Sequence, residues 1–311
     1  EGDGAPGLVV DAYAGWGVAA FDGAACEAFW RPRLPAVLDG LATGGFPLRG
    51  VVQKGKGDET VLWGKQPPDG AMNFMENGVC FEVDIRHGHK TGFFLDQRDN
   101  RRRLRGLADG KDVLDLFSYT GGFAVAAALG GARSTTAVDI ARPALEACRR
   151  NYALNGFNAD FFATTNGDSN ALGVSGEVTN LGSQGKHSLC AVDCWKFLSK
   201  ARLDGQRFDI VISDPPSMAP NERARSRALK AYTELNTGAL GVVRPGGLLL
   251  ACSCSSHISG RDLRTTVEAS ARQVGCSIEL ESRERAASDH PIRKGFPEGD
   301  YLQALYFRVL S

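Results

Sequence analysis

The sequence lacks two features that would point to a membrane protein or to a wholly basic nucleic-acid-binding protein. Its apolar runs stay below the roughly 18 residues that a membrane-spanning helix needs. Its 36 lysines and arginines are balanced by 36 aspartates and glutamates, so the chain as a whole carries no basic field. We therefore expect no membrane insertion, and contacts with nucleic acid must come from local patches of charge.

The sequence also lacks the cysteine pattern of a disulfide framework or a metal site. Its eight cysteines are scattered along the chain, which is typical of reduced thiols in a cytosol-like compartment. The pairs Cys190/Cys194 and Cys252/Cys254 have no matching second pair at zinc-site spacing. We therefore expect no metal.

The start of the chain bears on its compartment. It begins at Glu1, without a methionine and without a charged-then-apolar leader, so we expect a trimmed sequence whose targeting segment, if it has one, precedes Glu1. The expected compartment is the cytoplasm, or an organelle stroma or matrix if such a segment exists. The sequence leaves a homodimer open.

A length of 311 residues suits a large domain with a smaller one before it. Residues 1–86 are typical of a small α/β domain, with strands expected at 7–11, 17–21, 50–53, 60–63 and 79–83. A helix is expected over 24–41, interrupted near Pro32 and Pro35.

Residues 87–311 have a different sequence pattern, in which short apolar runs typical of strands alternate with stretches typical of helices. Strands are expected at 113–117, 136–139, 208–213 and 247–252, and helices at 122–129, 141–154 and 227–243. This alternation predicts an α/β fold with a doubly wound, mostly parallel sheet. Residues 164–186 are rich in Gly, Ser, Asn and Thr and have no apolar period, so we expect an exposed, flexible insertion there.

The first motif is a glycine loop, residues 118–122 (SYTGG), which follows the strand that contains Asp115. Ligands of open α/β sheets bind beyond the carboxyl ends of strands, and Gly121 and Gly122 let a ligand approach the backbone. The loop is neither G-x-G-x-x-G nor a lysine-containing phosphate loop, which argues against a dehydrogenase. The alternative is a plain strand-turn-helix link.

The second motif is Asp139, which ends the next strand about 20 residues after the glycines. A carboxylate at this place can accept hydrogen bonds from both ribose hydroxyls of an adenosine. Alternatively, Asp139 caps the helix that follows it.

The third and fourth motifs follow later strands. Asp214-Pro215-Pro216 ends the apolar run 208–213. Strand termination alone would explain the prolines but not the aspartate, and the triplet is typical of methyltransferases that act on bases, ring nitrogens or amino groups. Cys254 follows the run 247–252. A thiol at a strand end can attack C6 of a pyrimidine, although free cysteines are also buried as small hydrophobes, which we favour for Cys252.

Two groups of basic residues could neutralise nucleic-acid phosphates near this end of the sheet. Solvated charged faces are the alternative for each of them. The groups are Arg101, Arg102 and Arg103, before the first strand of the second domain, and Arg223, Arg227 and Lys230, after the Asp-Pro-Pro triplet.

Four segments together resemble the RlmI-type family of 23S ribosomal RNA cytosine-C5 methyltransferases. They are residues 87–101 (HGHKTGFFLDQRDNR), 116–123 (LFSYTGGF), 214–216 (DPP) and 253–255 (SCS). Residues 1–8, 289–291 and 297–302 are similar as well. The resemblance thus covers nearly the whole chain, and Lys90–Arg98 is its most specific part.

The resemblance implies a class I S-adenosylmethionine-dependent methyltransferase domain preceded by a small domain on the RNA side. Large-subunit ribosomal RNA would be the partner. Cys254 would be the nucleophile, and Asp214 would hydrogen-bond the cytosine. The residues expected to bind the methyl donor are Gln97, Arg98, Asp115, Phe117, Ser118, Tyr119, Thr120, Gly121, Gly122, Asp139, Asp193, Asp214 and Pro215.

Three departures from the family stand out. No PUA RNA-binding domain is present, so it was lost or precedes Glu1. The insertion at 164–186 comes just before Asp193, which is expected near the adenine. Cys252 supplies a second thiol.

Two other functions compete with this one. A ribosomal RNA guanine methyltransferase would share the Phe-Ser-Tyr-Thr-Gly loop, but guanine N7 needs no cysteine nucleophile. A non-catalytic RNA-binding or ribosome-assembly factor would not need Asp115, Gly121, Asp139, Asp214 and Cys254.

Overall fold

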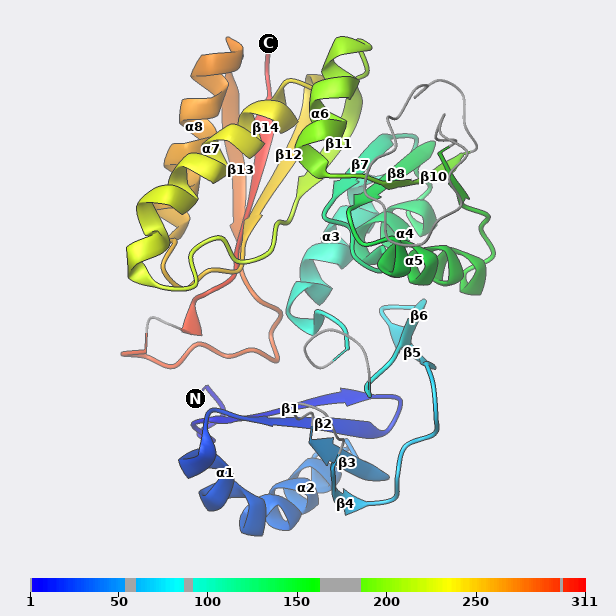
Figure 1. The fold of residues 1–311 in the computed structure, drawn as a ribbon, viewed down its shortest axis with the longest axis vertical. Coiled ribbons are helices and arrows are strands. Elements are labelled where there is room, and N and C mark those ends of the chain that lie inside the picture. Colours follow the sequence, from blue (N-terminus) through cyan, green and yellow to red (C-terminus); the bar gives the residue numbers. More distant parts are fainter. Residues whose placement is uncertain (1, 54–59, 87–91, 163–185, 297–298) are drawn as a thin grey trace. The chain divides into compact units, whose positions relative to one another are not determined.

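The computed structural model describes residues 2–53, 60–86, 92–162, 186–296 and 299–311 (Figure 1). The chain divides into two compact units. One comprises Glu1–Asp96 with Asp289–Gly299, and the other comprises Gln97–Ser288 with Asp300–Ser311. A short C-terminal segment therefore belongs to the N-terminal unit, which no local pattern in the sequence indicates.

The smaller unit contains a four-stranded sheet in the order β1-β2-β3-β4. The β2/β3 pair is parallel, and the other two pairs are antiparallel. The interruption expected at Pro32 and Pro35 is confirmed as a 3-10 turn, η1 (Arg31–Arg33), between two helices. The elements are β1 (Leu8–Tyr13), β2 (Trp16–Phe21), α1 (Ala24–Trp30), α2 (Leu34–Thr43), β3 (Gly50–Gln53) and β4 (Thr60–Gly64).

A hairpin of β5 (Met72–Glu76) and β6 (Val79–Val83) completes this unit. Its turn is Asn77-Gly78, and both residues have positive φ, as tight hairpin turns require. Phe74 and Phe81 from the hairpin pack with Phe93, at ring-centroid distances of 5.2 and 4.9 Å. Strand β5 was absent from the sequence-based prediction, although the Asn-Gly pair is a signal for it.

The larger unit is built on an eight-stranded sheet in the order β13-β14-β12-β11-β7-β8-β10-β9. Strands β7 to β12 pair in parallel, and β14 is antiparallel to both of its neighbours. The expected fold class is therefore confirmed. The strands are β7 (Asp112–Leu116), β8 (Ser134–Asp139), β9 (Asp160–Phe161), β10 (His187–Ala191), β11 (Phe208–Ser213), β12 (Val243–Ser253), β13 (Ile278–Glu284) and β14 (Gln303–Val309).

Helices cover both faces of this sheet (Figure 1). One face carries α3 (Arg98–Leu107), preceded by η2 (Leu95–Gln97), with α4 (Gly122–Leu129) and α5 (Arg142–Leu154). The other carries α6 (Cys194–Leu203), α7 (Arg225–Leu240), preceded by η3 (Glu222–Ala224), and α8 (Gly260–Val274). None of the helices in the described ranges combines the length and the apolar character that crossing a bilayer demands.

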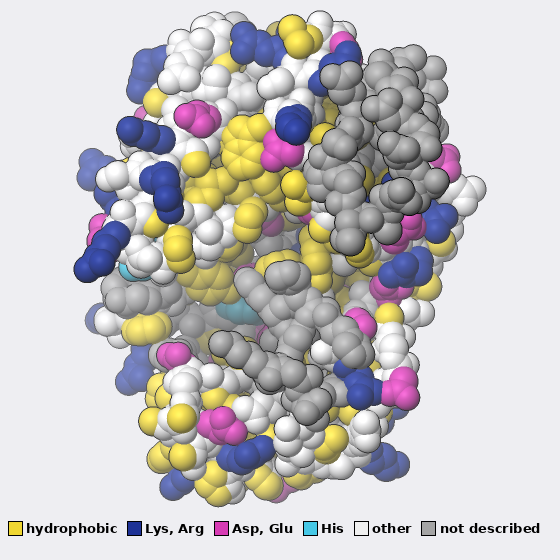
Figure 2. Space-filling view, viewed as in Figure 1, with side chains coloured by type: hydrophobic (Ala, Val, Ile, Leu, Met, Phe, Trp, Pro, Cys, Tyr) yellow, Lys and Arg dark blue, Asp and Glu magenta, His cyan; other side chains and the backbone are white. Residues whose placement is uncertain are grey.

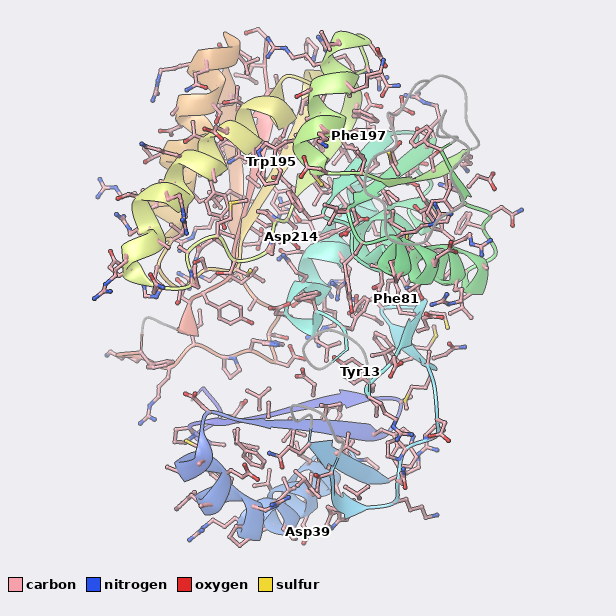
Figure 3. The ribbon with its side chains drawn as sticks, viewed as in Figure 1. Tyr13, Asp39, Phe81, Trp195, Phe197 and Asp214 are labelled. Carbon is pink, nitrogen blue, oxygen red and sulfur yellow. The ribbon has the colours of Figure 1, made fainter. Side chains whose placement is uncertain are left out.

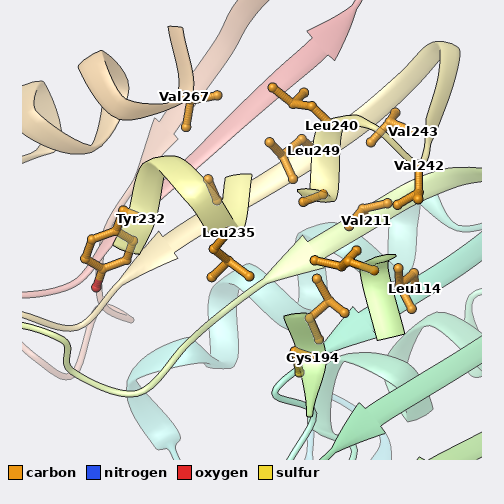
Figure 4. Close-up of a cluster of buried hydrophobic side chains, with 14 of the residues drawn as sticks. Leu114, Cys194, Val211, Tyr232, Leu235, Leu240, Val242, Val243, Leu249 and Val267 are labelled. Atoms are coloured by element: carbon orange, nitrogen blue, oxygen red, sulfur yellow. The ribbon is translucent and has the colours of Figure 1, made fainter. Parts of the chain in front are cut away.

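A hydrophobic core lies on each face of the larger sheet, and successive residues of a strand point alternately into one core and the other. Val113 and Ile210 belong to the core beneath α3 and α4. Leu114, Val211 and Leu249 belong to the core beneath α6, α7 and α8 (Figure 4). Burying such a side chain contributes roughly 1.5–3 kcal/mol each. Side chains alternate between the two faces of a strand with a period of two residues. This packing therefore fixes the face of the sheet on which each residue at the end of a strand lies.

A buried histidine links β8, β10 and α5 at the end of the larger sheet where its parallel strands begin. His187 begins β10, and its Nδ1 lies 2.9 Å from the hydroxyl of Thr135 on β8. Tyr152 of α5 stacks on the imidazole with ring centroids 5.2 Å apart. The imidazole is 2% exposed, and its Nε2 has no partner among the described residues. Burial, helped by the charge of Lys186, lowers the pKa of His187 to about 4.

This depressed pKa predicts a loss of stability in mild acid. An unfolded histidine takes up a proton near pH 6.5, whereas folded His187 resists it until about pH 4. Between those values the free energy of unfolding should fall by up to about 1.4 kcal/mol per pH unit through this group. Urea unfolding of wild type and His187→Gln at several pH values checks this. The variant should show the shallower pH dependence, and parallel curves would contradict the prediction.

Candidate active site

Four strands end in register at one edge of the larger sheet. Val138, Leu116, Ser213 and Ala251 lie side by side on β8, β7, β11 and β12. The chain goes from β7 to β8 on one side, while β11 lies on the other, so the strand order reverses here. Ligands of open α/β sheets bind at such a switch point. The loops that leave this row are therefore the candidate site.

The loop after β7 has an unusual backbone. Phe117, Tyr119 and Gly121 have φ values of 59°, 50° and 81°, in the left-handed region. Of the four non-glycine residues with positive φ in the described ranges, two lie in this loop. This conformation costs of order 1–3 kcal/mol per non-glycine residue and is concentrated at functional sites. The strain marks the loop as a binding element.

Neighbouring strands and helices hold the loop in this shape. The Tyr119 N–H donates to Oδ2 of Asp139 at 2.9 Å, and Nδ2 of Asn151 donates to the Thr120 carbonyl at 2.8 Å. The hydroxyl oxygens of Ser118 and Thr120 are buried and have no partner among the described residues. Leaving a buried hydroxyl unpaired costs about 1–3 kcal/mol. These two hydroxyls are available to a ligand.

Gly121 and Asp115 set the start of α4. A Cβ on Gly121 would lie 2.2 Å from Sγ of Cys148 on α5. Asp115 is buried, and its Oδ2 accepts the N–H of Ala124 in the first turn of α4 at 3.0 Å. Burial raises the pKa of Asp115 well above its ordinary value. Asp115 thus supports the loop from behind, and its contact with the methyl donor stays a prediction.

Asp139 accepts one backbone hydrogen bond at the entry to the following helix, which is part of the capping role considered for it. Its Oδ1 accepts the N–H of Ala141 at 2.8 Å, at the entry to α5. Asp193 caps α6, because its Oδ1 accepts the N–H of Lys196 at 3.0 Å. A carboxylate has about four acceptor positions, so each of these aspartates can also accept bonds from a ligand.

Two apolar groups beside these carboxylates were not identified from the sequence. Ile140, directly after Asp139, is 53% exposed. Trp195, in the first turn of α6, meets Phe117 edge to face with ring centroids 5.5 Å apart (Figure 3). The available signal was a large apolar residue one or two positions after Asp139 and Asp193. Such side chains offer apolar surface that suits a heterocyclic base.

Asp214 follows β11, which stops at Ser213 as the prolines predicted (Figure 3). Its Oδ2 accepts a hydrogen bond from Nε2 of Gln97 at 3.0 Å. The Cys254 thiol lies 3.9 Å from the carbonyl oxygen of Pro215. The loops after β11 and β12 therefore bring the thiol to the residue that follows Asp214.

Two buried serines fix the segment around Cys254. Tyr232 of α7 donates its hydroxyl hydrogen to Oγ of Ser253 at 2.9 Å, and Oγ of Ser255 donates to the Ala219 carbonyl at 2.7 Å. Burial raises the pKa of Tyr232 well above its ordinary value, which keeps it a donor. The thiol between these serines is held on a defined backbone.

The two thiols of this strand differ in access. Cys252 is 1% exposed and lies in the core beneath α3 and α4, and this burial raises its pKa well above the ordinary value. Cys254 is half-buried. The thiolate is the nucleophilic form. Of the two, Cys254 therefore suits attack on a substrate, and Cys252 is a core residue.

The predicted phosphate ligands fall into two groups. Arg101 is 4% exposed, and Arg103 pairs with Glu284 at 2.6 Å while lying over the Tyr306 ring, so both are committed within the protein. Arg98 lies 3.9 Å from Asp99. The exposed ones are Arg102, Arg223, Arg227 and Lys230. Dark blue side chains line the left edge of the larger unit, where α7 lies (Figure 2).

Some predicted features lie outside the described residues. These are the motif residues 87–91, the expected insertion except Lys186, and residues 1 and 297–298. Within the described ranges, no three His, Cys, Asp or Glu side chains are grouped as metal ligands would be.

Comparison with known proteins decides the family. A sequence model of the S-adenosylmethionine-dependent methyltransferases matches residues 47–308. The chain belongs to this family. Within it, the chain is 36% identical to the ribosomal RNA large subunit methyltransferase of Deinococcus radiodurans, over 99% of this chain and 71% of that protein. It is 34% identical to ribosomal RNA large subunit methyltransferase I of Shewanella amazonensis, over 99% and 73%. The RlmI-type resemblance is thus confirmed.

Solved structures of this methyltransferase class show the same fold. The methyltransferase SMU.776, crystallised with SAH, superposes with a TM-score of 0.79 at 24% identity, over 97% of this chain and 72% of that one. The tRNA m1G37 methyltransferase of M. jannaschii gives 0.58 at 17% identity, over 100% and 78%. The cofactor is S-adenosylmethionine, as expected from the sequence.

The described residues fit this donor. The loop presents two buried hydroxyls, at Ser118 and Thr120, that have no partner among the described residues. Asp139 lies one strand away and suits a ribose diol. Exposed Ile140 suits the apolar adenine ring.

Gly121→Ala tests the loop. The added Cβ is strained by the left-handed φ at this position and collides with Sγ of Cys148, so the loop must change shape. The dissociation constant for S-adenosylmethionine should therefore rise at least roughly tenfold. Gly156 is a matched control, since its φ is +82° and a Cβ there meets nothing within 4 Å. Gly156→Ala should cost only about 1 kcal/mol of stability through backbone strain and leave donor affinity unchanged. Isothermal titration and thermal unfolding check both, and equal donor affinity in the two variants would refute the assignment.

Proposed function

We propose that this protein forms 5-methylcytosine in large-subunit ribosomal RNA, with Cys254 as nucleophile and Asp214 as the carboxylate that holds the base. The observation that carries this is the half-buried Cys254 thiol, 3.9 Å from the carbonyl oxygen of Pro215, which follows Asp214 at the sheet edge that also carries the donor loop. The names of the relatives from Deinococcus radiodurans and Shewanella amazonensis support the ribosomal RNA substrate.

The thiol matters because C5 of cytosine is not nucleophilic by itself. The Cys254 thiolate adds to C6, which breaks the C5–C6 double bond and makes C5 electron-rich. C5 would then take the electrophilic methyl group that bound S-adenosylmethionine supplies, as the sulfonium S–CH3 bond breaks and leaves S-adenosylhomocysteine. A base then takes the proton from C5, the double bond re-forms, and the C6–S bond breaks to release the thiolate.

Asp214 has the chemistry to hold the base during these steps. An ionised carboxylate is an acceptor only, and the exocyclic N4 amine of cytosine is a donor. Accepting that hydrogen bond orients the ring for attack at C6. The prolines after Asp214 limit backbone motion at this point.

Exposed basic residues on η3 and in the first turns of α7 supply the phosphate contacts. Arg223, Arg227 and Lys230 are exposed, and α7 also carries Tyr232, which contacts the segment of Cys254. An RNA strand along this end of α7 would pass close to the thiol. The N-terminal residues 1–86 would contribute further RNA contacts.

Cys254→Ala tests the nucleophile. Formation of 5-methylcytosine should fall at least roughly 10³-fold, as when other catalytic nucleophiles are removed. Cys252→Ser is the matched control and should retain activity, because the thiol is buried and a hydroxyl preserves its contact with the Gln97 side chain. Mass spectrometry of nucleosides from unmodified ribosomal RNA measures the product. RNA containing 5-fluorocytosine should form a stable covalent adduct with wild type and Cys252→Ser only. Undiminished product with Cys254→Ala, or N7-methylguanine from wild type, would contradict the proposal.

The double variant Arg223→Gln/Arg227→Gln tests the RNA surface. If each arginine contacts a phosphate, the slope of log affinity against log salt concentration should decrease in magnitude by roughly 1.4 to 1.8. The control Arg202→Gln/Arg272→Gln removes two exposed arginines from the last turns of α6 and α8. Fluorescence anisotropy with a ribosomal RNA fragment gives both slopes, and equal slopes would rule out this surface.

A further inference from the structure

We propose that Asn100 is a positioning residue that acts through Gln97 to fix Asp214 as a hydrogen-bond acceptor, and so favours cytosine over uracil. Three hydrogen bonds connect Arg285, Asn100, Gln97 and Asp214 within the larger unit. The proposal rests on the proposed function, because it concerns the carboxylate that would hold the base.

The chain of hydrogen bonds begins at a group that can only accept. The backbone carbonyl of Arg285 lies 3.2 Å from Nδ2 of Asn100. An amide nitrogen carries two hydrogens, and the second one serves Oε1 of Gln97 at 2.6 Å. The Arg285 carbonyl thus determines which way the Asn100 amide is turned.

That orientation propagates to the carboxylate. Because Oε1 of Gln97 accepts from Asn100, its Nε2 must lie on the opposite side, 3.0 Å from Oδ2 of Asp214. Oδ2 of Asp214 must then accept. Both ends of the chain are acceptors, which gives one consistent direction for the two amides between them.

Burial makes this direction hard to reverse. Asn100 is 1% exposed and Gln97 is 2% exposed, so water does not replace a lost bond, and a reversed amide would be left unsatisfied. The backbone carbonyl of Asn100 also accepts from the Tyr306 hydroxyl at 3.3 Å. Helix α3, the segment after β13 and the loop after β11 therefore share one rigid polar chain.

The consequence is a preference between pyrimidines. The amide donor stabilises the ionised form of Asp214, which can accept from the N4 amine of cytosine. Uracil offers an acceptor oxygen at the same position, which an ionised carboxylate repels. A reversed Gln97 amide would bring Oε1 against the carboxylate and demand a proton there.

Asn100→Asp reverses the direction with little change in shape. The introduced carboxylate, once ionised, donates nothing, so Gln97 turns its Nε2 away from Asp214, and the Asp214 carboxylate loses a bond that favours its charged form. The acid limb of the pH profile of kcat/KM for 5-methylcytosine formation should move to higher pH by about one unit. Binding of S-adenosylmethionine should stay within about twofold of wild type. A merely structural defect would lower activity at every pH without moving this limb.

Asn236→Asp on α7 is the matched control, because Asn236 is also 1% exposed and a carboxylate there should leave the limb in place. If Asn100→Asp does not fold, Asn100→Ala frees the Gln97 amide without adding charge and should move the limb in the same direction by a smaller amount. An unmoved limb in a donor-binding Asn100 variant overturns the role of Asn100. The wild-type product tests the proposed function separately, because a methylated base other than cytosine contradicts that function.

Discussion

The parallel register of four strands is the constraint on which the rest of the site depends. Val138, Leu116, Ser213 and Ala251 stand in one row across the sheet. The glycine loop, Asp139, Asp214 and Cys254 each follow this row by only a few positions. A shift of one strand by a single residue would turn its side chains to the opposite face and separate the carboxylate from the thiol. The two hydrophobic cores resist such a shift, because each strand places alternate residues in each of them.

The parts of the fold that were predictable are those with short-range signals. The apolar runs that form β7, β8, β11 and β12 were identified with their order and type, and the prolines gave the end of β11. The glycine loop was predicted as a ligand site from its place after a strand. Its left-handed backbone at Phe117 and Tyr119 was not, because non-glycine residues rarely adopt it and only tertiary contacts such as the Asp139 bond sustain it.

The parts that escaped prediction depend on contacts between distant segments. Helix α3 is strongly polar, so no apolar period indicated it, and its buried Asn100 and Arg101 look like surface residues in the sequence. The preference for Cys254 over Cys252 as nucleophile could be made from the family resemblance, but the difference in exposure could not, because it depends on β12 ending at Ser253, between the two thiols. The return of Asp289–Gly299 to the smaller unit has no local signal at all.

The close approach of Gly121 to Cys148 has an evolutionary consequence. The first residue opens α4 and the second lies in the middle of α5, so they are neighbours in space although a full strand and loop separate them in the chain. The space between them is sufficient for one thiol and no further atom. Gly121 has no side-chain volume to give up, and its left-handed φ of 81° disfavours any other residue. Position 121 is therefore confined to glycine, and position 148 to side chains no larger than cysteine.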